Sequence, residues 1–260
     1  MQKPRIIFFD IDGTLIDMQK KQMTPNMLAT LHRLQENGII LCIATGRSPM
    51  TVPLEEFPGV EFDALVTYNG SYCYNARGTI YANPISTADV HTILRNAAAL
   101  GRPLCLATKD RLACNGSDRD LADYFAIAKE PIVVAPDFDA VAQGEVFQLM
   151  VGGREEEYPR LMQDVQGAKI AAWWDRALDI IPANGGKGIG IGKVLEYYGF
   201  DRADAMAFGD GNNDIEMFRA VGTGVAMANG SAQLKAAATD LCGDVAEDGI
   251  YHYCLENGLI

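Results

Sequence analysis

Short apolar segments alternate with amphipathic helical segments in the first third of this chain. Arg5–Phe9, Ile39–Ala44 and Ala64–Tyr68 have the length and composition of buried strands. Between the first two, Thr24-Pro25 predicts the start of a helix, because threonine caps a helix and proline fits its first turn. Strands separated by helices pair in parallel, so these residues are predicted to form βαβ units in the parallel sheet of an α/β fold.

The same alternation of strands and helices returns after residue 181, whereas residues 83–181 have a different pattern. After residue 181 we expect helices and strands at Lys187–Tyr198, Ala205–Phe208, Asp214–Ala220 and Gly224–Met227. From about residue 83 we expect helices and short strands in mixed order at Ser86–Leu100, Leu104–Ala107, Arg111–Asn115, Asp118–Ala128, Val146–Val151, Glu155–Val165 and Lys169–Ile181. We therefore predict a core domain made of residues 1–82 and 182–260, and an inserted α+β domain over residues 83–181.

The charge balance narrows the class of partner. Acidic residues number 34 and basic residues 22, and the net charge is −12. Nucleic acids and anionic membrane surfaces attract basic proteins, so neither is an expected partner.

The apolar runs are far shorter than the ~20 residues that span a bilayer, and the N-terminus lacks the pattern of a secretory or transit peptide. The six cysteines form no CxxC pair, so we expect a reduced, cytoplasmic chain without disulfides.

Two aspartates follow the first predicted strand directly. In extended chain, residues i and i+2 point the same way, so the carboxylates of Asp10 and Asp12 are expected to converge. Two like charges at ~4 Å repel by about 4 kcal/mol at an intermediate dielectric. A divalent cation would relieve that repulsion, and carboxylates favour hard ions such as Mg²⁺. The alternative, a turn at Asp12-Gly13, leaves Asp10 unexplained.

A second acidic segment lies between the predicted strand Ala205–Phe208 and the helix after it. Its sequence is GDGNND, in which Asp210 and either Asn213 or Asp214 can offer oxygens from two directions. A helix N-cap with acids in its first turn is the simpler alternative, and it accounts for only part of the segment. A calcium-binding EF-hand loop is excluded, because Ile215 stands where that loop needs glycine.

Two further segments suggest a functional site only when they are considered together with the two acidic segments. Thr45, at the end of the second strand, offers a hydroxyl suited to a phosphate oxygen, although an ordinary capped turn is the better explanation of this segment taken alone. Lys187 stands at a helix start, where the helix dipole is already positive. An acid cluster or an anionic ligand would compensate for that mismatch, although a solvated surface lysine is the better explanation of this residue taken alone. The glycines from 186 to 192 match neither a dinucleotide fingerprint nor a P-loop, since Val194 follows Lys193.

Together and in this order, the four segments resemble the motifs of the haloacid dehalogenase-like (HAD) superfamily. The matching residues are DxDGT at 10–14, Thr45, Lys187 and GDxxND at 209–214. The resemblance covers about residues 1–82 and 182–260, and the long insertion is similar to the type IIB cap of Cof-type sugar-phosphate phosphatases. It implies a core with a doubly wound, Rossmann-like parallel sheet and an inserted α+β cap.

The resemblance also implies roles for individual residues. Asp10 would be the nucleophile that forms an aspartyl-phosphate, and Asp12 would be the general acid and base. Thr45 and Lys187 would hold phosphoryl oxygens. Mg²⁺ would be held by Asp10, by Asp12 through its carbonyl, and by Asp210, with Asn213 and Asp214 acting directly or through water. The residues implied in substrate contact are Gly46, Arg47, Asn69 and Asn213.

These features lead to one main hypothesis and two alternatives. The main one is a Mg²⁺-dependent phosphatase of small phosphorylated metabolites, such as sugar phosphates. Family members that pump ions or cleave carbon–halogen bonds lack an acid at the place of Asp12, which favours a phosphatase or a phosphomutase. A phosphomutase or phosphotransferase with the same intermediate is the first alternative, and a non-catalytic module that binds a phosphorylated ligand is the second. The sequence leaves the physiological substrate and the oligomeric state open.

Overall fold

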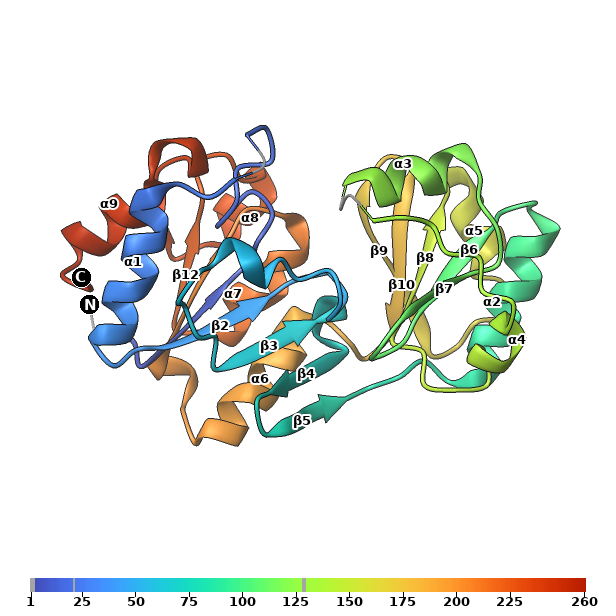
Figure 1. The fold of residues 1–260 in the computed structure, drawn as a ribbon, viewed down its shortest axis with the longest axis horizontal. Helices are drawn as coiled ribbons and strands as arrows, with labels where there is room; N and C mark the ends of the chain where they lie inside the picture. Colours follow the sequence, from blue (N-terminus) through green and yellow to red (C-terminus); the bar gives the residue numbers. More distant parts are fainter. Residues whose placement is uncertain (1–2, 21, 128–129) are drawn as a thin grey trace. The chain divides into compact units, whose positions relative to one another are not determined.

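The computed structural model describes residues 3–20, 22–127 and 130–260 (Figure 1). The chain divides into two compact units. The first, called the core unit, comprises Met1–Gly46, Pro53–Tyr81 and Gly186–Ile260. The second, called the inserted unit, comprises Arg47–Val52 and Ala82–Gly185. Among the described residues, no helix has the length and apolar character needed to cross a membrane.

A largely parallel sheet forms the centre of the core unit. Its order, over the described residues, is β13-β12-β11-β1-β2-β3-β4-β5. The strands are β1 (Ile6–Phe9), β2 (Ile40–Ala44), β3 (Ala64–Thr67), β4 (Tyr72–Asn75), β5 (Gly78–Ala82), β11 (Ala205–Gly209), β12 (Thr223–Ala226) and β13 (Asp240–Leu241). Pairing is parallel from β13 through to β3, and β4 then runs antiparallel to β3. The predicted α/β class and parallel sheet are confirmed. Strand order reverses beside β1, the point where open sheets of this kind bind ligands.

Helices cover both faces of this sheet, as in a doubly wound fold. They are α1 (Pro25–Glu36), α6 (Lys187–Tyr198), α7 (Ile215–Ala220), α8 (Ala232–Ala237) and α9 (Gly249–Glu256). One face packs side chains of β1, β2 and β3 against α6, α7 and α8 in a continuous apolar core. On the other face, α1 and α9 lie side by side (Figure 1), and Tyr253 of α9 packs edge-on against Phe208 of β11. The predicted α6 has the bounds that the structure shows, whereas α8, α9 and β13 lie beyond the last predicted element.

The inserted unit is a smaller, wholly antiparallel sheet with helices on both faces. Its order over the described residues is β7-β6-β8-β10-β9. Its elements are α2 (Thr87–Ala99), β6 (Leu104–Ala107), β7 (Leu112–Cys114), α3 (Arg119–Ile127), α4 (Phe138–Val141), β8 (Gln148–Gly152), α5 (Tyr158–Leu161), β9 (Ala168–Trp174) and β10 (Ala177–Pro182). Apolar side chains of α2, α4 and α5 pack on one face, and those of α3 on the other.

One predicted element of the inserted unit is wrong. A single helix was expected over Glu155–Val165, but the structure has a 3₁₀ turn at Glu155–Glu157 followed by the four-residue helix α5. Pro159 is the physical reason for the break. It has no N–H to donate to an earlier turn, so it fits only the first turn of a new helix.

The glycines of α6 allow this helix to approach its neighbours closely. A Cβ atom on Gly190 would lie 2.7 Å from Val66 Cγ1 of β3 and 2.9 Å from the Cα of Gly70. A Cβ atom on Gly192, two residues further on, would meet nothing within 4 Å. The glycine-rich stretch therefore serves packing between helix and sheet at position 190, whereas the glycine at position 192 has no packing role.

This contrast leads to a matched pair of substitutions. We expect Gly190→Ala to lower the free energy of unfolding by roughly 1–3 kcal/mol, because its methyl group overpacks the contact with β3. Gly192→Ala should raise it by up to about 1 kcal/mol, because alanine has the higher helix propensity and the site is open. Urea denaturation of both variants checks the prediction. Equal stabilities of the two variants would contradict it.

Candidate active site

Three polar residues follow neighbouring parallel strands at one edge of the core sheet. Asp10 follows β1, Thr45 follows β2 and Asp210 follows β11. Since β1 pairs in parallel with both other strands, the three carboxyl ends meet at the same edge. The Asp10 N–H donates to the Phe208 carbonyl at 3.0 Å, which extends the β1–β11 pairing up to the aspartate. The strand order therefore brings together residues that are far apart in the chain.

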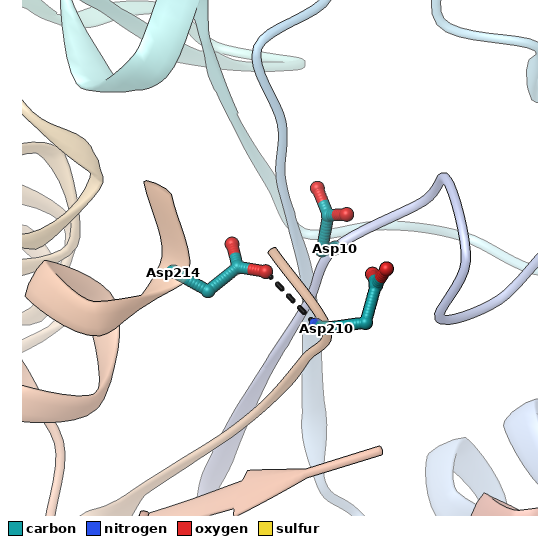
Figure 2. Close-up of side chains that lie close together, drawn as sticks. All are labelled: Asp10, Asp210 and Asp214. Carbon is teal, nitrogen blue, oxygen red and sulfur yellow. Dashed lines mark hydrogen bonds between the residues drawn. The ribbon is translucent and has the colours of Figure 1, made fainter. Parts of the chain in front are cut away.

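Three carboxylates form a cluster at this edge. Each of Asp10, Asp210 and Asp214 offers an oxygen within 4.8 Å of the others. Figure 2 shows Asp10 on one segment and both Asp210 and Asp214 on another, the one that follows β11. Asp214 is fully buried, and Asp10 is only 8% exposed. Carboxylate oxygens in such a group are the donor set that a hard divalent cation prefers.

Lys187 supplies a positive charge to this cluster. Its Nζ donates to Asp10 Oδ1 at 2.7 Å and to Asp214 Oδ1 at 2.6 Å, and the side chain is fully buried. Burial by itself lowers the pKa of Lys187, but the charges of Asp10 and Asp214 outweigh it and raise that pKa above its ordinary value. The alternative of a solvated surface lysine is thereby excluded. The predicted acid cluster beside the helix start is the environment that the structure shows.

Asp214 is held on both of its oxygens. While Oδ1 accepts from Lys187, Oδ2 accepts from the backbone N–H groups of Asp210 and Gly211, each at 3.0 Å. Its fit requires glycine before Asp210, since a Cβ on Gly209 would lie 2.5 Å from Asp214 Oδ2. These contacts orient the loop that carries Asp210, which favours a supporting role for Asp214 over direct binding of a metal.

The cluster carries an excess of negative charge. When all are ionised, the three carboxylates leave two negative charges beyond the one positive charge of Lys187. Burial raises the pKa of Asp10 well above its ordinary value, Lys187 opposes that rise, and the charge of Asp214 adds to it. Burial and the charge of Asp214 likewise raise the pKa of Asp210 to about 7. A divalent cation would balance the excess, so the residues present fit Mg²⁺.

The turn after β1 packs directly on Asp210. Asp12 is half-buried, two residues beyond Asp10. Gly13 has a φ of +83°, and a Cβ there would lie 2.3 Å from Asp210 Oδ2, so only glycine fits. Thr14 donates from Oγ1 to Asp210 Oδ1 at 2.9 Å. The two acidic segments therefore meet through Gly13 and Thr14 as well as through Asp10, as the Mg²⁺ ligands implied by the resemblance require.

A second group of predicted residues surrounds Asn69. The backbone N–H of Asn69 donates to the Thr45 carbonyl at 3.0 Å, and its side-chain Oδ1 accepts from Asn213 Nδ2 at 3.2 Å. A Cβ on Gly46 would lie 3.1 Å from Asn69 Nδ2. Asn69 is buried in the left-handed region, at φ 51° and ψ 38°. Strained backbone of this kind is concentrated at functional sites.

Arg47 is the last of the predicted substrate-contact residues, and the site also contains two residues, Thr14 and Asn229, with no role predicted from the sequence. Arg47 belongs to the segment that packs with the inserted unit, and its Nη1 donates to the Thr51 carbonyl at 2.8 Å. Thr14 was part of a motif to which sequence analysis gave no separate role. Asn229, whose Nδ2 donates to the Gly13 carbonyl at 2.7 Å, was missed. Its one sequence signal is its place just past β12, another strand that ends at this edge.

Known proteins resemble this chain over nearly its whole length. A family model described as haloacid dehalogenase-like hydrolase matches residues 7–254. The YkrA protein of Bacillus subtilis (strain 168) is 33% identical, over 98% of both chains. A phosphatase of the same organism, 5-amino-6-(5-phospho-D-ribitylamino)uracil phosphatase YitU, is 27% identical over 98% of this chain and 97% of its own. The solved structure of a HAD subclass IIB sugar phosphatase has a TM-score of 0.88 and 25% identity, and covers 98% of this chain and 100% of that chain.

Proposed function

This chain belongs to the haloacid dehalogenase-like hydrolase family, and on that basis we propose that it is a Mg²⁺-dependent phosphatase acting through an aspartyl-phosphate on Asp10. The observation that carries the proposal is the buried contact of Lys187 with Asp10, beside the carboxylate of Asp210. The substrate class is a small phosphate ester, and sugar phosphates are the first candidates. The names of the phosphatase YitU and of the subclass IIB sugar phosphatase support this class.

The reaction we propose has two half-reactions on the same carboxylate. Lys187 contacts Oδ1 of Asp10, so we assign the attack on phosphorus to Oδ2. A bond forms between this oxygen and phosphorus, the ester P–O bond breaks, and Asp12 gives its proton to the leaving alcohol oxygen. Asp12 then removes a proton from a water molecule, whose oxygen bonds to phosphorus while the bond between phosphorus and Oδ2 of Asp10 breaks. Inorganic phosphate leaves, and the carboxylate of Asp10 is restored.

Lys187 and Thr45 are proposed to hold the transferring phosphoryl group. Negative charge spreads over its oxygens in the transition state, and fixed donors in a site of low dielectric stabilise that charge strongly. Lys187 is a fixed donor of this kind, because two carboxylates and complete burial hold its Nζ in place. Thr45 is also buried and lies at the end of the neighbouring strand. We propose that Gly46, Arg47, Asn69 and Asn213 contact the substrate.

Asp10 and Asp210 are the residues proposed to hold Mg²⁺ directly, together with the carbonyl of Asp12. Asp214, which accepts from the Asp210 N–H, and Asn213 are proposed to support the ion directly or through water. When bound, the ion would balance the excess negative charge and polarise the phosphoryl group. We also propose that residues 83–181 form a cap that selects the substrate. A cytoplasmic location is proposed because all six cysteines are unpaired.

Metal removal should affect both activity and stability. We expect EDTA to abolish turnover and to lower the melting temperature, since the negative charge in excess of that of Lys187 is then uncompensated. Added Mg²⁺ should restore both, and at 100 times its dissociation constant the ion stabilises by ~2.7 kcal/mol. Thermal melts with EDTA and with a Mg²⁺ titration measure the effect. A melting temperature insensitive to Mg²⁺ would contradict the proposed metal site.

The function itself is tested by a product assay. Purified protein is incubated with p-nitrophenyl phosphate, sugar phosphates, nucleotides and pyridoxal phosphate, with and without Mg²⁺, and released inorganic phosphate is measured. We expect Mg²⁺-dependent release from several substrates. Release without any divalent metal would refute the proposal. An isomerised sugar phosphate in place of free phosphate would instead identify a phosphomutase.

A further inference from the structure

Asn229 joins two segments that flank the site. Its Nδ2 donates to the Gly13 carbonyl at 2.7 Å, in the turn that carries Asp12. Its Oδ1 accepts from the Val245 N–H at 3.1 Å, at the start of a 3₁₀ turn. The side chain thus uses its amide group as a bridge, with the donor end on the β1 turn and the acceptor end on a segment near the C-terminus.

The loop that carries Asn229 is hydrogen-bonded to the loop after β11, which carries Asp210. The Ser231 N–H donates to the Asp210 carbonyl at 3.0 Å, and the Met227 N–H donates to the Gly209 carbonyl at 3.0 Å. A Cβ on Gly230 would lie 3.1 Å from the Asp210 carbonyl oxygen, so the two backbones are in close contact. Asn229 therefore extends from a support that is fixed to the backbone of Asp210.

Thr14 makes a second link between the turn after β1 and Asp210. Its Oγ1 donates to Asp210 Oδ1 at 2.9 Å, and its side chain is buried. The turn itself contains Gly13, a residue with wide conformational freedom. Backbone bonds within the turn define its shape, among them the one from the Gly13 N–H to the Ile16 carbonyl at 2.9 Å, and contacts from outside hold it against Asp210. Thr14 and Asn229 make two such contacts, one to the carboxylate of Asp210 and one from the loop fixed to its backbone.

We propose that Thr14 and Asn229 are positioning residues, a two-point clamp that holds the turn carrying Asp12 against Asp210. The clamp keeps the general acid and the metal-binding carboxylate in one relative geometry, although neither residue touches the reacting atoms. This inference rests on the proposed function. Outer contacts of this kind matter because sites lose efficiency when their groups are displaced by as little as ~1 Å.

The test uses substitutions that remove the donor from each contact. Thr14→Val keeps the shape but loses the hydroxyl, Thr14→Ser keeps the hydroxyl, and Asn229→Ala removes the amide. For Thr14→Val and Asn229→Ala we expect the half-saturating Mg²⁺ concentration to rise about 10-fold and kcat to fall about 10-fold. KM for p-nitrophenyl phosphate should change less than about two-fold, because the substrate contacts remain. Thr14→Ser should retain wild-type behaviour.

A matched control separates positioning from stability. Asn37 Nδ2 donates to the Leu259 carbonyl at 2.8 Å, which is the same kind of bond in the same unit. Asn37→Ala should lower the melting temperature and leave the Mg²⁺ requirement unchanged. The assays are run far below the melting temperature of each variant, where lower stability leaves the protein folded and does not shift the half-saturating metal concentration. The Mg²⁺ dissociation constant, measured by calorimetry without substrate, gives a readout that is independent of turnover.

Each outcome decides the question. If Asn229→Ala and Thr14→Val behave like Asn37→Ala, with unchanged metal affinity, the clamp is structural only and the inference fails. Thr14 is buried, so Asn229→Ala, on an exposed side chain, decides the matter if Thr14→Val does not fold. A wild-type protein that binds Mg²⁺ without turnover refutes the proposed function, and calorimetry still tests the clamp. A wild-type protein with neither property overturns both.

Discussion

Replacing Asp10 with asparagine abolishes phosphate release from every substrate and leaves the fold intact. An amide cannot attack phosphorus, so the first half-reaction stops and kcat falls roughly 10⁴-fold or more. Burial holds the pKa of Asp10 well above its ordinary value, which means that the ionised carboxylate costs the folded state free energy. Neutral asparagine removes that cost. We therefore expect a melting temperature, measured without metal, that equals or exceeds that of the wild type.

Asp17→Asn is the matched control for this result. Asp17 is a nearby buried aspartate whose carboxylate accepts from the backbone N–H groups of Gln19 and Lys20. The bond from Gln19 contributes most to a lowered pKa, the opposite of the shift at Asp10. Asp17→Asn should thus lower stability above the ordinary carboxyl pKa and retain turnover. If Asp10→Asn retained more than about a hundredth of the wild-type kcat, Asp10 would not be the nucleophile.

Replacing Lys187 with methionine has the largest expected effect on stability. Methionine fills a similar volume but leaves Asp10 and Asp214 buried without the positive charge that both contact. Removing one partner of a buried ion pair typically costs about 3–5 kcal/mol, because the remaining charge is uncompensated. Turnover should also fall by about 10²–10³-fold or more, since a fixed donor to the phosphoryl group is lost. Guanidinium denaturation and steady-state kinetics measure the two effects.

A second lysine on the same helix provides the control. Lys193 Nζ contacts Glu196 Oε2 at 2.9 Å, and both side chains are exposed. Such surface pairs contribute about 1 kcal/mol at most, so Lys193→Met should be nearly neutral. Adding Asp214→Asn to Lys187→Met should recover part of the lost stability, because it removes one uncompensated charge. Equal stabilities of Lys187→Met and Lys193→Met would show that the buried ion pairs do not stabilise the fold.

Local signals in the sequence predicted the elements on which the site is built. Helix α6 was predicted with the bounds that the structure shows, and Gly199 ends it in the left-handed conformation, at φ +68°. The helix expected over Glu155–Val165 failed for an equally local reason, the proline at position 159. The parallel sheet followed from the alternation of strands and helices, and the structure confirms it.

The environment of single side chains could not be predicted in this way. Taken alone, Lys187 was better explained as a surface residue, yet its side chain is fully buried between two carboxylates. Asn229 carried no chemical signal of its own, because an asparagine in a loop after a strand is common. Both residues acquire their contacts from segments that are distant in the chain, 177 residues apart for Lys187 and Asp10 and 216 apart for Asn229 and Gly13.

The sequence by itself determined which residues stand at strand ends and which residue types they are, since hydrophobic periodicity and hydrogen-bonding preference act over a few neighbouring positions. Only the tertiary structure decided which strand ends are neighbours, how deeply each charge is buried, and which donor each carboxylate oxygen contacts. These properties depend on the order of strands in the sheet and on close packing between segments. The order β11-β1-β2 brings Asp10, Thr45 and Asp210 to one edge, and the packing of α6 against β3 and α7 adds Lys187.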